Sequence, residues 1–245
     1  MRRVGAFARA FLLAAITSSV SSNIASADIE IDDEKTTLFF AGGDLWRHGL
    51  FSYGGLLWSP AGLDNQGFTL KILLGGGRYR YISGALGNAA VVGEQDLAFV
   101  LPGWRFQKDR LTVSFFAGLD AQHHRLIPDD PSSSLRGTEL GVRGGFDLWF
   151  EPGPHTMIGA DASISSVGPS YSARLAFGWR LPDSFYVGPE IGGFADGQNY
   201  HQVRAGLQVT GVKTGQLEWS AGFGWAFDRD DRNGLYGRLG VFVRR

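Results

Sequence analysis

The stretch LTVSFFAGLDAQ, residues 111–122, decides the fold, because it is apolar overall and yet contains an acid, Asp120. Successive side chains of a β-strand point to opposite faces, so alternate residues belong together. One set is apolar throughout: Leu111, Val113, Phe115, Ala117, Leu119 and Ala121. The other set is mixed, with polar groups beside one ring: Thr112, Ser114, Phe116, Gly118, Asp120 and Gln122. The pattern predicts a strand between two different solvents rather than a buried core segment.

The same alternation recurs along the chain after residue 35. ELGVRGGFDLWF (139–150), LEWSAGFGWAFD (217–228) and GLYGRLGVFV (234–243) each place apolar residues on one face and charged or small residues on the other. Turn signals such as EPGP, PD, KTG and NG separate the segments. The sequence therefore predicts about twelve antiparallel strands, at 36–47, 50–58, 66–81, 90–106, 110–124, 137–150, 155–166, 170–181, 184–195, 201–212, 216–228 and 234–243.

Composition excludes several classes of function. The 245 residues include 23 basic and 24 acidic side chains, so the formal net charge of −1 gives no reason to expect a nucleic-acid partner. There is no cysteine, which excludes disulfides and thiolate chemistry. The 36 glycines and the 13% of aromatic residues favour sheets and turns over helix bundles.

The N-terminus has the pattern of a secretory signal. Arg2, Arg3 and Arg9 precede and flank a short apolar run, AFLLAAI, and the small residues ASA end at residue 27. We expect a cleaved signal peptide over 1–27, an acidic N-terminal segment over 28–35, and one domain over 36–245. No later run approaches the roughly 18 consecutive apolar residues of a membrane helix.

Export, alternation and an even number of strands together describe an all-β outer-membrane protein, a transmembrane antiparallel up-and-down β-barrel. The strands have about the 9–11 residues that a spanning strand needs. The seven tryptophans lie toward strand ends, where interfacial girdles belong, although Trp46 and Trp149 share the polar parity. A soluble β-sandwich shows the same alternation and stays open as an alternative. Polar faces that are rich in glycine and carry few charges of mixed sign favour an enclosed lumen.

The charged residues of the polar parity form a predicted lumen network. They are expected either to pair as an ion-pair network that stiffens the barrel, or to line a polar path or a sugar site. The predicted lumen residues are Asp44, Lys71, Asp96, Asp120, Glu139, Arg143, Asp147, Asp161, Arg174, Arg180, Glu190, Arg204, Glu218 and Arg238, with Glu94 and Asp228 on the same parity.

No residue pattern predicts a catalytic site, a metal site or a cofactor. His123 and His124 are adjacent in a strand, so they face opposite ways and do not chelate together. There is no G-x-S-x-G elbow, but an outer-membrane hydrolase using His123, His124 or His201 stays open. Tyr79 and Tyr81 in GGGRYRY (75–81) mark either an interfacial strand end or a platform for sugar.

Two long segments resemble a known family. FFAGGDLWRHGLFSYGGLLWSPAGLDNQGFTLKILLGGGRYRY (39–81) and GWRFQKDRLTVSFFAGLDAQHHRLIPDDPSSSLRGTELGVRG (103–144) are similar to the BcsS family of bacterial cellulose biosynthesis proteins. The resemblance extends over residues 36–243. It implies an outer-membrane location and an accessory, non-enzymatic part in making, exporting or retaining cellulose, and it assigns no catalytic residues.

We therefore expect a monomeric barrel in contact with outer-membrane lipid, with the glucan chain and the cellulose synthase machinery as further partners. A narrow porin for small solutes or oligosaccharides is the main alternative function.

Overall fold

The computed structural model describes residues 34–181, 185–197, 200–229 and 232–245. The predicted signal peptide, all but two residues of the predicted acidic segment, and the PD turn at 182–183 lie outside the described residues. Within the described part of the chain, no helix has the length and apolarity needed to cross a membrane. A single short 3-10 helix, η1 (Gly84–Leu86), connects two strands.

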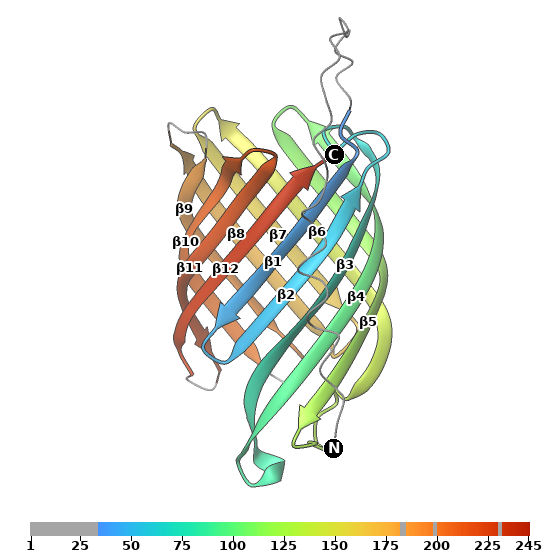
Figure 1. Cartoon of the computed structure of the whole chain (residues 1–245), viewed down its shortest axis with the longest axis vertical. Helices are drawn as coiled ribbons and strands as arrows, with labels where there is room; N and C mark the ends of the chain where they lie inside the picture. Colours follow the sequence, from blue (N-terminus) through green and yellow to red (C-terminus); the bar gives the residue numbers. More distant parts are fainter. Residues whose placement is uncertain (1–33, 182–184, 198–199, 230–231) are drawn as a thin grey trace, which may run out of the picture. The chain divides into compact units, whose positions relative to one another are not determined.

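Twelve β-strands make up the sheet (Figure 1). Their bounds are β1 (Thr37–Trp46), β2 (Gly49–Trp58), β3 (Gly67–Ser83), β4 (Ala89–Lys108), β5 (Leu111–Ile127), β6 (Gly137–Gly153), β7 (Thr156–Ser165), β8 (Ser170–Arg180), β9 (Tyr186–Ala195), β10 (His201–Thr214), β11 (Leu217–Asp228) and β12 (Gly234–Arg244).

The sheet is a closed barrel. Each strand pairs antiparallel with its neighbours in the sequence, and β1 closes the cylinder on β12, with Phe39 opposite Val243 and Asp44 opposite Arg238. The predicted fold class is confirmed, and a closed cylinder leaves no unpaired sheet edge along its wall. We call the end where β1 starts and β12 finishes the terminal rim, at the top of Figure 1, and the opposite end the distal rim.

The outward face is apolar, as the alternation predicted. Leu119, Leu140 and Phe223 are largely exposed there. Trp58, Trp104 and Trp179 are also exposed and lie at the ends of their strands next to the terminal rim. This arrangement is typical of an interfacial aromatic girdle.

Two other tryptophans point inward, as their parity indicated. Trp46 is buried near the distal rim. The ring of Trp149 packs edge-on against Tyr186, with the ring centroids 5.9 Å apart. These two side chains fill the lumen rather than anchor the barrel in lipid.

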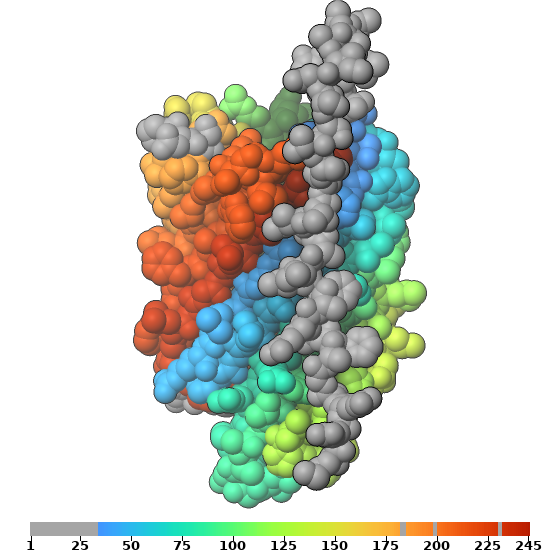
Figure 2. Space-filling view, viewed as in Figure 1, coloured from blue at the N-terminus to red at the C-terminus, as the bar shows by residue number. Residues whose placement is uncertain are grey.

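One side of the wall is taller than the rest. Strands β3 to β6 have 17, 20, 17 and 17 residues, whereas β1, β2, β7 and β9 have 10 each. The surplus of β3, β4 and β5 projects at the distal rim, at the bottom of Figures 1 and 2. We call this part the extension: residues 78–83, 89–96 and 123–127, with η1 at its tip.

Glycines make the wall thinner where a large inward side chain packs against it. Gly206 of β10 lies directly opposite Gly224 of β11. A Cβ on Gly206 would lie 2.6 Å from the Tyr236 hydroxyl and 2.8 Å from the Gly224 Cα. Only glycine leaves room for such a close approach, which explains the GLQV and GFGW stretches of these strands.

Candidate functional site

Three ion pairs reach across the lumen between strands that are not neighbours, and we call them chords. In each pair, two strands of the ring lie between the two partners. Lys71 on β3 contacts Asp147 on β6 at 2.8 Å. Arg204 on β10 contacts Asp44 on β1 at 2.5 Å. Arg238 on β12 contacts Glu190 on β9 at 2.7 Å. Side chains that reach so far around the ring occupy the space that a wide pore would need.

Asp120 is buried at a node of the lumen. Its Oδ2 accepts hydrogen bonds from Arg143 Nη2 at 2.7 Å, from Gln122 Nε2 at 2.9 Å and from the Ser165 hydroxyl at 2.5 Å. The guanidinium of Arg143 also lies 5.2 Å from the centre of the Phe99 ring. The acid in the apolar stretch is therefore neutralised by neighbouring strands, which a buried carboxylate requires.

A second node gathers around Glu190. Its Oε2 contacts Arg238 at 2.7 Å and Arg174 at 3.6 Å, and Arg174 also contacts Asp161 at 2.7 Å. The Tyr236 hydroxyl donates to Glu190 Oε1 at 3.0 Å. Four strands meet at this group, and only 3% of the Glu190 side chain is exposed.

The remaining predicted lumen residues lie near the rims. Arg180 contacts Glu151 at 3.7 Å at the terminal end of the lumen. Glu139 and Glu218 have the inward parity, and neither forms an ion pair with any residue in the described ranges. Asp228 accepts from Arg232 at 2.9 Å at the distal rim.

Asp96 does not face the lumen, and its predicted place is wrong. On β4 the buried residues Val91, Leu101 and Arg105 have odd numbers, whereas the exposed Val100 and Trp104 share the parity of Asp96. Asp96 is exposed on the outer face. Its neighbour in parity, Glu94, likewise faces outward and contacts Arg78 at 2.7 Å and Arg125 at 3.8 Å. The outward face of β3 and β4 therefore carries charged residues at this level, where the extension begins.

An apolar cluster fills the terminal end of the lumen. Leu57, Leu101 and Phe116 point inward from the wall, and Leu63 packs on them from the connection between β2 and β3. Arg105, also buried, donates to the Leu63 carbonyl and holds that connection in place. The sequence pattern did not reveal this plug, because a connecting segment has no face periodicity.

The inner face of the extension carries aromatic and neutral polar groups. The rings of Tyr79 and Tyr81 are stacked, with centroids 6.2 Å apart and planes 23° from parallel. Next to them, Gln95 donates to Gln122 at 2.9 Å, and His124 lies 3.1 Å from the same Gln122 oxygen. We call these five residues the distal site.

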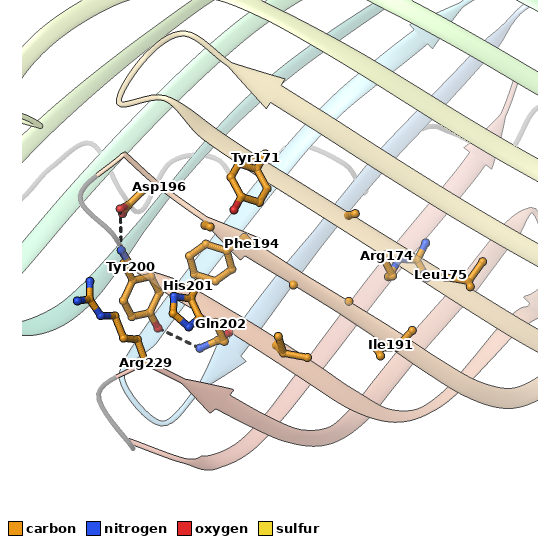
Figure 3. A pocket seen from close by; sticks show the side chains of 15 residues that line it. Tyr171, Arg174, Leu175, Ile191, Phe194, Asp196, Tyr200, His201, Gln202 and Arg229 are labelled. Atoms are coloured by element: carbon orange, nitrogen blue, oxygen red, sulfur yellow. Dashed lines mark hydrogen bonds between the residues drawn. The ribbon is translucent and has the colours of Figure 1, made fainter.

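The opposite side of the distal mouth is also aromatic (Figure 3). Phe194 and Tyr200 have ring centroids 5.4 Å apart, and the Tyr200 hydroxyl accepts a hydrogen bond from Gln202 at 3.2 Å. These residues contribute to a pocket of about 840 Å³. Its lining also includes the outward Leu175 and Ile191, so the pocket involves both faces of a thin, glycine-rich part of the wall rather than an enclosed chamber.

Electrostatics at the distal site favour neutral groups. Burial raises the pKa of Tyr79 to about 12, and the negative charge of Asp196, from the opposite side of the mouth, raises it as well. Burial lowers the pKa of His124 below its usual 6.5, so the imidazole is uncharged at neutral pH. Asp130 accepts from the Tyr81 hydroxyl at 3.0 Å and from the Ser132 hydroxyl at 2.6 Å. The Ser132 bond is the main reason that the Asp130 pKa falls to about 2.

The histidines do not assemble a hydrolase site among the described residues. His123 is exposed on the outer face, while His124 is buried on the inner face. His124 contacts Gln122 and Tyr79, neither of which is the serine or acid of a hydrolytic triad. His201 is exposed on β10. Among the described residues, no group of three or more histidine, aspartate or glutamate side chains has an arrangement that could hold a metal ion.

Two solved structures have backbones similar to that of this chain. The COG4313 outer membrane channel from Pseudomonas putida F1 is 12% identical with a TM-score of 0.58, over 91% of this chain and 100% of that one. The transport unit of the autotransporter AIDA-I from Escherichia coli is 11% identical with a TM-score of 0.49, over 88% of this chain and 92% of that one. At such identities the first likeness shows the fold alone, that of an outer-membrane barrel.

Sequence comparison gives the family. Among curated proteins, none matches this chain. The profile of the family described as "Cellulose biosynthesis protein BcsS" matches residues 38–245, which includes every strand of the barrel except the first residue of β1. The resemblance carried by residues 39–81 and 103–144 is thus confirmed, and the chain belongs to the cellulose biosynthesis protein BcsS family.

Proposed function

We propose that this protein is a non-enzymatic outer-membrane accessory of cellulose biosynthesis that acts on the exported glucan at its distal mouth. The family places the chain in cellulose biosynthesis, and the fold is that of an outer-membrane barrel. The proposal adds that the barrel is a holder for the glucan rather than a conduit for it.

The side chains that cross and obstruct the lumen are the observation that carries this proposal. The three chords cross the interior, and the Leu63 cluster fills the terminal end. Inward side chains such as Met157 and Gln208 are 2% and 1% exposed. A barrel of this strand number has more interior space than an eight-stranded one, so large inward side chains are needed to fill it. A glucan chain could not pass without breaking several of these ion pairs.

The lengths of the strands and connections at the two rims indicate that the distal mouth faces the outside of the cell. The longest strands extend furthest at the distal rim, and the nine-residue connection 128–136 between β5 and β6 lies there as well. Outer-membrane barrels have their longer loops outside. The tryptophan girdle and the two-residue turn between β4 and β5 lie at the terminal rim. We infer that the signal peptide over 1–27 is removed on export and that the terminal rim faces the periplasm, toward the synthase machinery.

The closed sheet also supports a monomer. Barrels have no free strand edge through which a second copy would pair. Outer-membrane lipid then surrounds the apolar outer face, and the glucan is the partner at the distal mouth.

The test is deletion of the gene with cellulose staining, scored separately for the amount of cellulose and for its attachment to cells. We expect reduced cellulose or loosened attachment, and restoration by the wild-type gene but not by a variant lacking residues 80–92. Normal amounts together with normal attachment in the deletion strain would contradict the proposal.

A further inference from the structure

We propose that Tyr79 and Tyr81 form the platform on which a neutral β-linked glucan chain lies, with Gln95 beside them to bind its hydroxyls. The buried Gln122 and His124 hold Gln95 and Tyr79 in place. This inference rests on the proposed function and names the site where it would be carried out. It is argued from the position of the extension, the geometry of the rings and the balance of charge.

The extension carries its two tyrosines to the distal mouth, where both are partly exposed while Val91, His124 and Leu126 beside them are buried. On the outside of β3 and β4, Leu74 and Val100 are exposed apolar residues, and the next residues toward the distal rim include Arg78, Glu94 and Asp96. We infer that the lipid ends where the outer face changes from apolar to charged residues. Tyr79 and Tyr81 are level with or beyond this change, so their partly exposed rings lie at the mouth rather than deep in the lumen.

The two rings are held in one orientation before any ligand arrives. The Tyr81 hydroxyl is hydrogen-bonded to Asp130, and the Tyr79 hydroxyl lies 3.5 Å from His124 Nδ1. Below them, Gly93 lacks a side chain, and a Cβ there would overlap the Tyr79 ring. Rings fixed in this way lose little side-chain entropy on binding, which favours stacking on the flat, C–H-rich face of a sugar.

The charge balance selects a neutral polymer. The polar members of the distal site are two amides and an uncharged imidazole, which donate to and accept from hydroxyls equally well. Two arginines of the distal rim are engaged elsewhere, since Arg232 binds Asp228 and the Arg80 carbonyl, and Arg78 binds Glu94 on the outer face. Asp196 adds negative charge across the mouth. An acidic polysaccharide would meet repulsion here, whereas a neutral glucan would not.

The test uses the full barrel in detergent micelles and cellohexaose as the probe, with affinity measured by titration calorimetry. We expect wild-type binding, and a loss of about tenfold or more for the double variant Tyr79→Ala/Tyr81→Ala, because two stacking contacts disappear. Tyr79→Phe and Tyr81→Phe keep the rings, so each is expected to stay within about threefold of wild type. Each variant is first shown to be folded by its gel mobility without boiling.

The matched control is Tyr171→Ala, because Tyr171 is a largely exposed tyrosine on the outward face near the same rim. We expect its cellohexaose affinity to equal that of wild type. Polygalacturonate, an anionic polymer, is expected not to displace cellohexaose. The inference is overturned if wild type does not bind cellohexaose, if the double alanine variant binds like wild type, or if polygalacturonate binds more tightly.

The outcomes separate this inference from the proposed function. If the deletion strain makes defective cellulose but the purified barrel does not bind cellohexaose, the tyrosine platform is ruled out and the accessory role is retained. Binding of cellohexaose by a protein whose deletion changes nothing in cells removes the accessory role instead.

Discussion

The body of the barrel and the extension are built from the same sheet but obey different rules. In the body, inward groups such as Asp120 and Glu190 are buried and bonded to several partners across strands. In the extension, the tyrosine pair is partly exposed, and each hydroxyl is tethered to a neighbouring side chain. In the body, polar groups fill and stiffen the lumen, whereas in the extension the tyrosine pair stays partly accessible. The difference assigns stability to the body and ligand binding to the extension.

Removing a buried carboxylate from the body should have the largest effect. Glu190→Gln leaves Arg238 and Arg174 without their shared partner, and breaking a buried ion pair costs about 3 kcal/mol of unfolding free energy. Urea-induced unfolding in lipid vesicles measures this loss. The control is Glu94→Gln, since the Glu94 pair with Arg78 is largely exposed and should contribute less than about 1 kcal/mol. Equal effects of the two substitutions would contradict the division of the molecule.

Filling the thin wall should have the next largest effect. Gly206→Ala places a Cβ against the Tyr236 hydroxyl and the backbone of β11, and overpacking of this kind costs about 2 kcal/mol. Gly237→Ala on β12 is the matched control, because nothing lies within 4 Å of the added carbon. The temperature at which unboiled protein loses its compact gel mobility provides the measurement. A drop of the same size in both variants would show that crowding of the lumen is not the cause.

Shortening the extension should hardly change the body. Tyr79 lies opposite Gly93, so residues 80–92 can be replaced by Asn-Gly, which closes a two-residue hairpin. We expect a folded barrel with unfolding free energy within about 1 kcal/mol of wild type, because locally unfolding segments contribute little to global stability. Cellohexaose binding is expected to disappear. Failure of the shortened chain to reach the compact form would show that the extension is part of the barrel's core.

Acid should break the Asp130 tether of the tyrosine pair only at very low pH. The Asp130 pKa falls from 3.8 to about 2 in the folded protein, so its stabilising contribution is complete above about pH 4 and disappears as the pH falls through 2. Cellohexaose affinity should therefore not change through Asp130 between pH 7 and pH 4.5. Asp130→Asn keeps an acceptor for the Tyr81 hydroxyl, so its cellohexaose affinity at pH 7 should stay within about threefold of wild type. A wild-type loss centred near pH 4 would contradict this assignment.

The sequence predicted the body well because the membrane imposes a period of two on every spanning strand. That constraint placed twelve strands and assigned the inward face to Asp120, Glu190 and Arg204. It failed at Asp96 because polar or charged side chains lie on both faces of the wall at the extension. Polarity then no longer distinguishes the inside from the outside.

The chords and the plug could not be predicted from the pattern alone. Asp44 and Arg204 are far apart in the sequence, and only closure of the sheet brings their strands within reach of each other. Leu63 belongs to a connection without periodicity, so its place in the lumen depends on tertiary packing. Tyr79 and Tyr81 were recognisable as a strand end or a sugar platform, but their stacking and their Asp130 tether required the fold.

Single-channel recording in a planar lipid bilayer tests the central claim most directly, namely that side chains fill the lumen. The purified wild-type barrel is expected to insert without opening stable conductance steps, because the Lys71–Asp147, Arg204–Asp44 and Arg238–Glu190 pairs occupy the interior. Reproducible, long-lived conductance steps from the wild-type protein would contradict the account and would favour a narrow porin.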